Sequence, residues 1–215
     1  MRDATPGPHQ GQPLVQAGTA VEDAHAALIL VHGRGASARS IIQFGRQVAP
    51  TEFVLLAPQA ADNEWYPQSF LAPVEQNEPG RRSGLQAIDD AVETARAASI
   101  PTERIALAGF SQGACLVSEY VARNPDRYGG LAVLSGGLLG ETVDPADYQG
   151  ALDGTPVFLG CSDIDPHIPE QRVHATAAVF ESLDAAVDTR IYDGMAHTVN
   201  DDELDAVAAM LADLD

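Results

Sequence analysis

The chain has 215 residues, of which 45% are hydrophobic, and this is enough for one complete core but too little for two domains of ordinary size. Its formal net charge of −19 excludes nucleic acid and anionic membrane surfaces as partners. No uncharged apolar run is long enough to cross a membrane, and the two cysteines, Cys115 and Cys161, predict neither a disulfide framework nor a metal site.

The chain begins with a polar segment and continues with buried strands. Residues 1–13 lack the apolar core of a secretory signal, so we expect a flexible tail, a cytoplasmic protein and a single domain over residues 14–215. Leu14–Ala17 is expected to form an edge strand. The continuous apolar runs at 26–31 and 53–57 are typical of strands that are buried on both faces.

Two helices and a long loop are expected around these strands. The segment from Ile41 to Val48 carries its apolar side chains on one side. Residues 60–82 form an irregular loop with the only tryptophan of the chain, Trp65, which is more than a simple connection needs. The segment from Ser83 to Ser99 has apolar residues at helical spacing, and Ser83 is a suitable N-cap.

From residue 105 onward, apolar strands and helical patterns alternate. Strands are expected at 105–108, 131–134, 156–160 and 189–192, and helices at 114–123, 173–183 and 202–214. Buried strands separated by helices predict an α/β fold, with a mostly parallel central sheet covered by helices on both faces and without a separate cap domain. In such sheets functional residues gather beyond the carboxyl ends of the strands.

The stretch Ile105–Cys115 (IALAGFSQGAC) predicts a strand, a sharp turn and a helix, with Ser111 at the turn. Gly109 and Gly113 remove the Cβ atoms that would collide with the neighbouring strand and helix. The turn lifts the Ser111 hydroxyl to the start of a helix, where free N–H groups favour a developing negative charge. The alternative is a glycine-rich turn whose serine only caps the helix.

A base and a carboxylate follow Ser111 in the order expected for an α/β-hydrolase. His197 would take the Ser111 proton and later return it to the leaving group. Asp165 and Asp163 compete to hold the imidazole, and we choose Asp165 because Pro166 and the following Ile-Pro make a rigid turn. Asp163 is expected to stabilise the loop instead. The other histidines lie in no such motif and are expected at the surface or in loops: His9, His25, His167 and His174.

An oxyanion needs two backbone donors. One is expected to be the N–H of Gln112, directly after the nucleophile, and the other the N–H of Arg34 in the glycine-punctuated loop after the first buried strand. Loss of one such donor costs on the order of 3 kcal/mol of transition-state stabilisation. The sequence contains no phosphate-cradle, zinc or dinucleotide motif, so we expect neither a metal nor a cofactor.

All 12 basic residues are arginines, whereas 31 residues are acidic. An acidic surface without lysine resembles that of proteins from extreme halophiles, in which high salt screens the repulsion between carboxylates. A genome rich in G and C would explain the arginines but not the excess of acid. We therefore interpret the chain as halophilic.

Several motifs between about Leu28 and the C-terminus together resemble the phospholipase/carboxylesterase family of α/β-hydrolases, which includes the acyl-protein thioesterases. The resemblance implies a triad of Ser111, Asp165 and His197, oxyanion donors at Arg34 and Gln112, and hydrolysis of carboxylic esters or thioesters without a cofactor. The motifs are HGRG at 32–35, Trp65-Tyr66, Glu78-Pro79-Gly80, GFSQG at 109–113, Leu134-Ser135-Gly136-Gly137, Asp165-Pro166-His167-Ile168-Pro169 and Gly194-Met195-Ala196-His197.

Two differences from the thioesterase members lie where an acyl chain would bind. Those members usually have Trp-Phe-Asp where this chain has Trp-Tyr-Pro at 65–67, and their counterpart of the 135–139 loop is bulkier and contains a tryptophan. We therefore expect hydrolysis of esters with short- to medium-chain acyl groups. The residues expected to shape an apolar acyl site are Trp65, Tyr66, Phe70, Leu138 and Leu139.

Three other interpretations compete with this one. An acyl-protein thioesterase or lysophospholipase would use the same residues, a dienelactone-type hydrolase would carry cysteine in place of Ser111, and a catalytically silent binding protein would usually lack a triad residue. The expected partner is a small-molecule ester or thioester, without nucleic acid or a membrane anchor. The helix after Ser111 and the C-terminal helix each offer a face for a homodimer.

Overall fold

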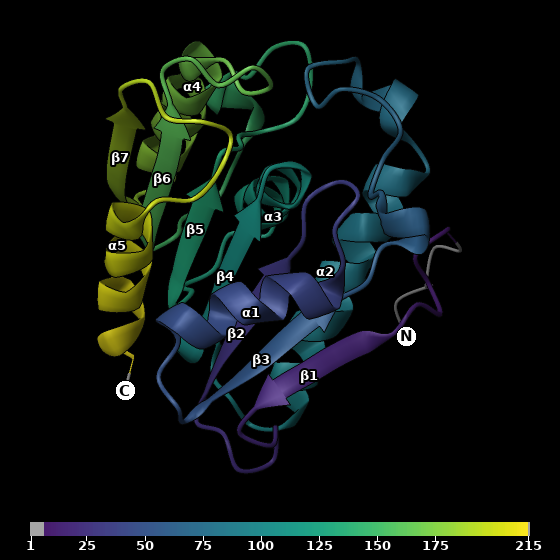
Figure 1. Ribbon diagram of the computed structural model, residues 1–215, viewed down its shortest axis with the longest axis vertical. Coiled ribbons are helices and arrows are strands. Elements are labelled where there is room, and N and C mark those ends of the chain that lie inside the picture. Colours follow the sequence, from purple (N-terminus) through teal and green to yellow (C-terminus); the bar gives the residue numbers. More distant parts are fainter. Residues whose placement is uncertain (1–6, 215) are drawn as a thin grey trace.

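The computed structural model describes residues 7–214 and contains a seven-stranded sheet (Figure 1). β1 is antiparallel to β3, and all other neighbouring strands are parallel. The predicted α/β class with a mostly parallel sheet is therefore confirmed. In spatial order the strands are β1 (Leu14–Gly18), β3 (Phe53–Pro58), β2 (Ala26–Val31), β4 (Ile105–Phe110), β5 (Gly130–Leu134), β6 (Pro156–Ser162) and β7 (Ala186–Tyr192).

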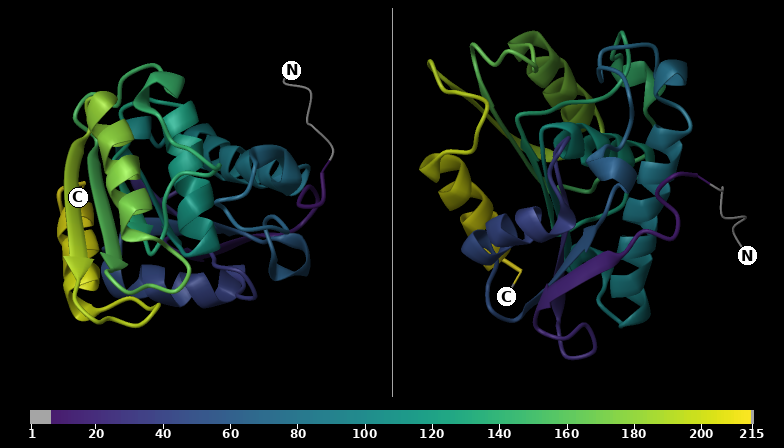
Figure 2. Two further views of the ribbon diagram at one scale, coloured as in Figure 1. Left: turned by 90° about the horizontal axis from the view of Figure 1, so that it is seen from above. Right: turned by 45° about the vertical axis from the view of Figure 1, so that its right-hand side comes forward.

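Helices cover both faces of the sheet, as expected. The two that pack on one face are α1 (Ala38–Val48) and α5 (Asp201–Ala212), and the three on the other are α2 (Gly80–Ala97), α3 (Gln112–Arg123) and α4 (Glu170–Ser182) (Figures 1 and 2). Each helix in the described part of the chain is too short or too polar to span a bilayer. Single 3-10 turns occupy Ala61–Asn63, Val74–Asn77, Thr102–Arg104 and Pro145–Asp147.

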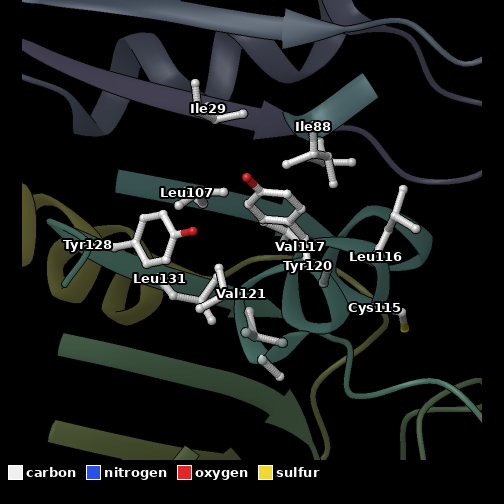
Figure 3. Packing of buried hydrophobic residues seen from close by; sticks show 14 of the residues in the cluster. Ile29, Ile88, Leu107, Cys115, Leu116, Val117, Tyr120, Val121, Tyr128 and Leu131 are labelled. Atoms are coloured by element: carbon white, nitrogen blue, oxygen red, sulfur yellow. The ribbon is translucent and has the colours of Figure 1, made fainter. Parts of the chain in front are cut away.

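Each face of the sheet has its own hydrophobic core because side chains alternate along a strand. In β2, Ile29 belongs to the core under α2 and α3, whereas Leu28 and Leu30 belong to the core under α1 and α5. All six residues of β2 are buried, which explains why this strand reads as a continuous apolar run. Figure 3 shows the first of these cores, where sheet and helix side chains meet: Ile29, Leu107, Ile88, Val117 and Tyr120.

The start of α2 differs from the prediction. The helix begins at Gly80, so Ser83 lies in its first turn and is not the N-cap. The Glu78 carboxylate accepts the N–H of Arg82, which satisfies a free donor of the first turn in place of a serine cap. The Ser83 hydroxyl instead accepts a hydrogen bond from the His9 backbone at 2.9 Å.

His9 belongs to the segment predicted as a flexible tail, of which residues 1–6 lie outside the described residues. His9 lies in a turn, as the loop alternative expected, but its side chain is buried and not at the surface. Nε2 donates to the Trp65 carbonyl at 2.8 Å, and Nδ1 accepts the Ala61 N–H at 3.1 Å. These bonds attach the described end of the chain to the long loop after β3.

The first turn of α5 contains a buried carboxyl group. Glu203 and Asn200 cap the helix reciprocally: Glu203 Oε2 accepts the Asn200 N–H at 2.9 Å, and Asn200 Oδ1 accepts the Glu203 N–H at 2.9 Å. The other oxygen, Oε1, faces Gly160 of β6 and has no hydrogen-bond partner among the described residues. Burial raises the pKa of Glu203 to about 7, which the Asn200 N–H only partly opposes.

This raised pKa makes stability depend on pH. Between the ordinary value of 4.5 and about 7, the folded state retains a proton that the unfolded state has lost. The contribution of Glu203 to the free energy of unfolding should therefore be highest below pH 4.5. This contribution should fall by on the order of 3 kcal/mol as the pH rises to about 7. We expect Glu203→Gln to remove this slope, measured as the difference between variant and wild type in urea titrations from pH 4 to pH 8.

Glu181→Gln, at an exposed position of α4, is the control and should leave the slope unchanged. Unfolding free energies of wild type and Glu203→Gln that stay parallel over this pH range would contradict the assignment.

Candidate active site

Ser111 occupies the sharp turn between β4 and α3. Its φ of 55° and ψ of −121° lie in a strained region for a residue with a side chain. Gly109 and Gly113 make the turn feasible, because a Cβ on Gly113 would collide with the Val31 carbonyl and one on Gly109 with the backbone of Gly113. The nucleophile turn therefore packs directly against the end of β2.

Ser111, His197 and Asp165 meet at the carboxyl ends of the strands. His197 Nε2 lies 2.9 Å from Ser111 Oγ, and His197 Nδ1 lies 2.6 Å from Asp165 Oδ2. Because the ionised carboxylate only accepts hydrogen bonds, Nδ1 carries the ring proton and Nε2 is free to accept the Ser111 hydroxyl proton. The three predicted residues thus form one continuous hydrogen-bonded chain.

The surroundings of Asp165 keep it ionised. Burial alone would raise the pKa of this carboxyl, whose side chain is 0% exposed. The hydrogen bond with His197 and the backbone N–H groups of His167 and Ile168, at 2.8 Å and 3.0 Å from Oδ1, outweigh burial and lower the pKa below 3.8. The rigid turn after Asp165 therefore supplies the donors that stabilise its charge.

Asp163 makes a different contact. Its Oδ1 accepts the N–H of Gly194 at 2.8 Å and so joins the loop after β6 to the loop that carries His197. No hydrogen bond between Asp163 and His197 is found in the described structure. The geometry therefore brings Asp165, and not Asp163, to the imidazole.

The His197 ring packs between two other rings. The ring centroids of Phe110 and His197 are 4.9 Å apart, and those of His167 and His197 are 5.0 Å apart with nearly perpendicular planes. His167 also lines the cavity in front of Ser111. Sequence reasoning did not place His167 in the site, although its position two residues after Asp165 was a signal.

A cavity of about 520 Å³ opens in front of Ser111. Its walls are formed by Ser111, by His197 and by residues of the loops after β2 and β3, and the turn after Asp165 closes one side. The apolar part of its lining includes Tyr66, Phe70, Phe110, Cys115 and Ile168, and the polar part includes Arg34, Gln68, Ser69, Gln112, His167 and His197.

Two of the five predicted acyl-site residues, Tyr66 and Phe70, line this cavity, and three do not. Leu138 and Leu139 are buried against the region of α4, where the Leu138 N–H and carbonyl bond to Thr176 and Arg172. Trp65 is also fully buried, and its Nε1 donates to the His32 carbonyl at 2.8 Å. These three predicted acyl-site residues are therefore buried core residues that do not line the cavity in front of Ser111.

The loop after β2 is held by His32, which is fully buried. The Ala60 N–H donates to its Nε2 at 3.2 Å, so the ring proton is on Nδ1 and is donated to the Gly33 carbonyl at 2.8 Å. Burial lowers the pKa of His32, which keeps the ring neutral as this arrangement requires. The predicted oxyanion residues Arg34 and Gln112 both line the cavity beside Ser111.

Within residues 7–214, no three histidine, cysteine or acidic side chains are grouped as metal ligands. The arrangement is suited to nucleophilic catalysis: a strained serine and the imidazole that bonds to it face one cavity, and a buried ionised carboxylate holds the imidazole from behind.

Comparisons with known proteins agree with this geometry. Residues 14–214 match the sequence model of the Phospholipase/Carboxylesterase family. Acyl-protein thioesterase 1 of Eremothecium gossypii is 30% identical over 90% of this chain and 90% of its own length. A phospholipase/carboxylesterase structure from Dyadobacter fermentans is 38% identical, with a TM-score of 0.92 over 98% of this chain and 100% of that one.

A carboxylesterase structure from Mesorhizobium loti, at 21% identity, shares the fold with a TM-score of 0.69 over 94% of this chain and 99% of that one. The family match spans nearly the whole described domain and includes every residue of the Ser111 site. The chain therefore belongs to the phospholipase/carboxylesterase family and is a carboxylic ester hydrolase.

Proposed function

We propose that the protein hydrolyses esters of short- to medium-chain carboxylic acids through an acyl-enzyme on Ser111. The observation that carries this proposal is the hydrogen-bonded chain from Asp165 through His197 to Ser111, whose Ser111 end lines a cavity of about 520 Å³. Such a chain makes a serine nucleophilic and returns its proton to a leaving group.

The reaction follows from the proton positions. Ser111 Oγ attacks the ester carbonyl carbon while its proton passes to His197 Nε2. The tetrahedral adduct collapses, the C–O bond to the alcohol breaks, and His197 returns the proton to the alcohol oxygen. Water then enters, gives its proton to His197 and attacks the acyl-enzyme, which releases the acid and restores the Ser111 hydroxyl. Asp165 stabilises the imidazolium in both steps.

The oxyanion donors in this proposal are the backbone N–H groups of Gln112 and Arg34. Gln112 is the first residue of α3, so its N–H has no partner within the helix. The carbonyl of Gly33 is bonded to His32, and in a trans peptide the N–H points away from the C=O. The Arg34 N–H of the same peptide unit is thus directed away from His32.

The cavity supports a short- to medium-chain acyl group. Its apolar lining includes Tyr66, Phe70 and Cys115, which are at most 6% exposed and so close the cavity from behind. Burial raises the pKa of the Cys115 thiol to about 12, so this surface carries no charge. In an apolar recess of limited volume, each methylene group added to the acyl chain strengthens binding by about 0.8 kcal/mol until the recess is full.

Thioester hydrolysis is the second candidate function, favoured by the similarity to acyl-protein thioesterase 1 of Eremothecium gossypii. The same nucleophile, base and oxyanion donors would cleave an S-acyl bond. Turnover of an ester and a thioester with identical acyl groups separates the two candidates. A folded protein without turnover and without labelling by a fluorophosphonate would favour a silent binding protein instead.

Substitution of Ser111, His197 and Asp165 tests the mechanism. We expect Ser111→Ala and His197→Ala each to lower kcat for p-nitrophenyl butyrate by roughly 10⁶-fold and Asp165→Asn by roughly 10⁴-fold. The double variant Ser111→Ala/His197→Ala should be no worse than the single ones. Asp163→Asn is the matched control, because Asp163 bonds to Gly194 and not to His197. The assays should be run in low salt and in molar KCl, since the acidic composition indicates a halophilic protein.

A loss of activity for Asp163→Asn as large as that for Asp165→Asn would contradict the assignment of the carboxylate. Loss of fluorophosphonate labelling in Ser111→Ala identifies the nucleophile independently of any ester.

Phe70 tests the acyl site. Phe70→Ala removes a ring from the cavity lining, so the acyl length with the highest kcat/KM should move to longer chains across p-nitrophenyl esters from acetate to palmitate. Ile164→Ala is the control, because Ile164 is 65% exposed and does not line the cavity. An optimum that stays at the wild-type length in folded Phe70→Ala would show that the acyl group binds elsewhere.

A further inference from the structure

Tyr66, Pro67 and Gln68 line one side of the cavity and belong to a stretch of irregular backbone at residues 64–68, here called the 64–68 wall. It belongs to no helix or strand, so contacts from outside must hold its polar groups in place. The guanidinium of Arg34 provides several of them. Nη2 donates to the carbonyls of Tyr66 at 2.8 Å and Gln68 at 3.0 Å, and Nη1 donates to the Pro67 carbonyl at 3.3 Å and pairs with Glu64.

The side chain of Gln112 holds the same wall from the side of α3. Its Oε1 accepts the Trp65 N–H at 2.9 Å, and its Nε2 donates to the Tyr66 carbonyl at 2.8 Å. Gln112 is only 6% exposed, so these bonds are shielded from water. The two residues whose backbones are proposed as oxyanion donors, Arg34 and Gln112, therefore both form hydrogen bonds to the 64–68 wall through their side chains.

Further bonds join the two loops behind this wall. The Gly35 N–H donates to the Asn63 carbonyl at 2.8 Å, the Trp65 indole N–H donates to the His32 carbonyl at 2.8 Å, and the Ala60 N–H donates to His32. The loop after β2 and the loop after β3 are thus bonded along their length. A displacement of the 64–68 wall would be transmitted to the Arg34 peptide.

We propose that Arg34 is a positioning residue: its guanidinium fixes the 64–68 wall and couples the fit of the acyl group against that wall to the placement of the oxyanion N–H groups. This inference rests on the proposed esterase function. It assigns a role to the side chain of Arg34, in addition to the role proposed for its backbone.

The chemistry favours arginine at this position. Three successive carbonyl oxygens, those of Tyr66, Pro67 and Gln68, converge on one cation. A planar guanidinium, with five N–H donors spread over a fork, fits such a row of acceptors better than the single ammonium nitrogen of lysine. The side chains of Arg34 and Glu64 are 45% and 36% exposed, and an ion pair this exposed contributes little by itself. The bonds to the carbonyls are therefore expected to decide the geometry, with Glu64 only orienting the guanidinium.

The coupling has a kinetic signature. An acyl group that fills the cavity packs against the 64–68 wall and fixes its position. Through the side chains of Arg34 and Gln112, it thereby also fixes the backbone N–H groups that stabilise the oxyanion in the transition state. In the wild type, longer acyl groups should therefore raise kcat up to the optimum and not merely lower KM. Once the guanidinium is lost, acyl length should affect KM alone.

The experiment compares Arg34→Met, Arg34→Lys and Glu64→Gln with wild type, and uses Arg39→Met as the control for loss of an exposed arginine. For Arg34→Met we expect kcat on the preferred p-nitrophenyl ester to fall roughly 10- to 100-fold, the size of effect seen when a reacting group is slightly misplaced, and the dependence of kcat on acyl length to disappear. Arg34→Lys should recover part of the lost kcat and part of the dependence of kcat on acyl length. Glu64→Gln should change kcat less than roughly threefold, because an exposed ion pair contributes little free energy.

Hydrogen exchange provides a readout that needs no turnover. The Trp65 and Gln68 amides are bonded to Gln112 and Asn77, so they should exchange faster in Arg34→Met than in wild type, whereas amides of β4 should not change. Wild-type exchange at these amides, or a kcat lowered equally for all acyl lengths, would overturn the proposal. If wild type neither turns over esters nor reacts with a fluorophosphonate, the esterase function fails, and the exchange data alone decide whether Arg34 positions the wall.

Discussion

The site depends on the contact between the Ser111 turn and the end of β2. Gly113 lies so close to the Val31 carbonyl that no other residue fits there, and this contact sets the distance between α3 and the loop after β2. It fixes the start of α3 against the end of β2, from which the loop with Arg34 continues. The strain at Ser111 is held by the parallel strands on either side of β4, since β2 and β5 both pair with it along its length.

A second level of organisation is polar. His32, Gln112 and Arg34 hold the long loop after β3 by hydrogen bonds, and this explains how so much irregular backbone lines a cavity without secondary structure of its own. His32 directly follows β2, and Gln112 begins α3 two residues after β4, whereas Arg34 lies three residues after β2. The rigid part of the fold therefore determines the shape of the loop from outside.

Local sequence patterns were sufficient for the sheet and for the positions of Ser111, Asp165 and His197. These residues follow strand ends. The strands before Ser111 and Asp165 are recognisable because they are buried on both faces, whereas β7, before His197, is only partly buried. Which side chains line the cavity depends on how loops pack, and no local pattern encodes that. Leu138 and Trp65 are apolar residues near the site, yet Leu138 packs by α4, and the Trp65 side chain packs behind the backbone of the 64–68 wall. His9 pairs with Trp65 across 56 positions, a contact that only the folded chain reveals.

The position of Trp65 makes it an optical reporter of the site. It is the only tryptophan of the chain, it is fully buried, and its ring centroid lies 5.1 Å from that of His9 and 5.0 Å from that of His32. Its backbone belongs to the 64–68 wall and its indole is bonded to the loop after β2. Emission excited at a wavelength that tryptophan absorbs and tyrosine does not therefore comes from one indole between the two loops that border the cavity, so movement of either loop is visible in unlabelled protein.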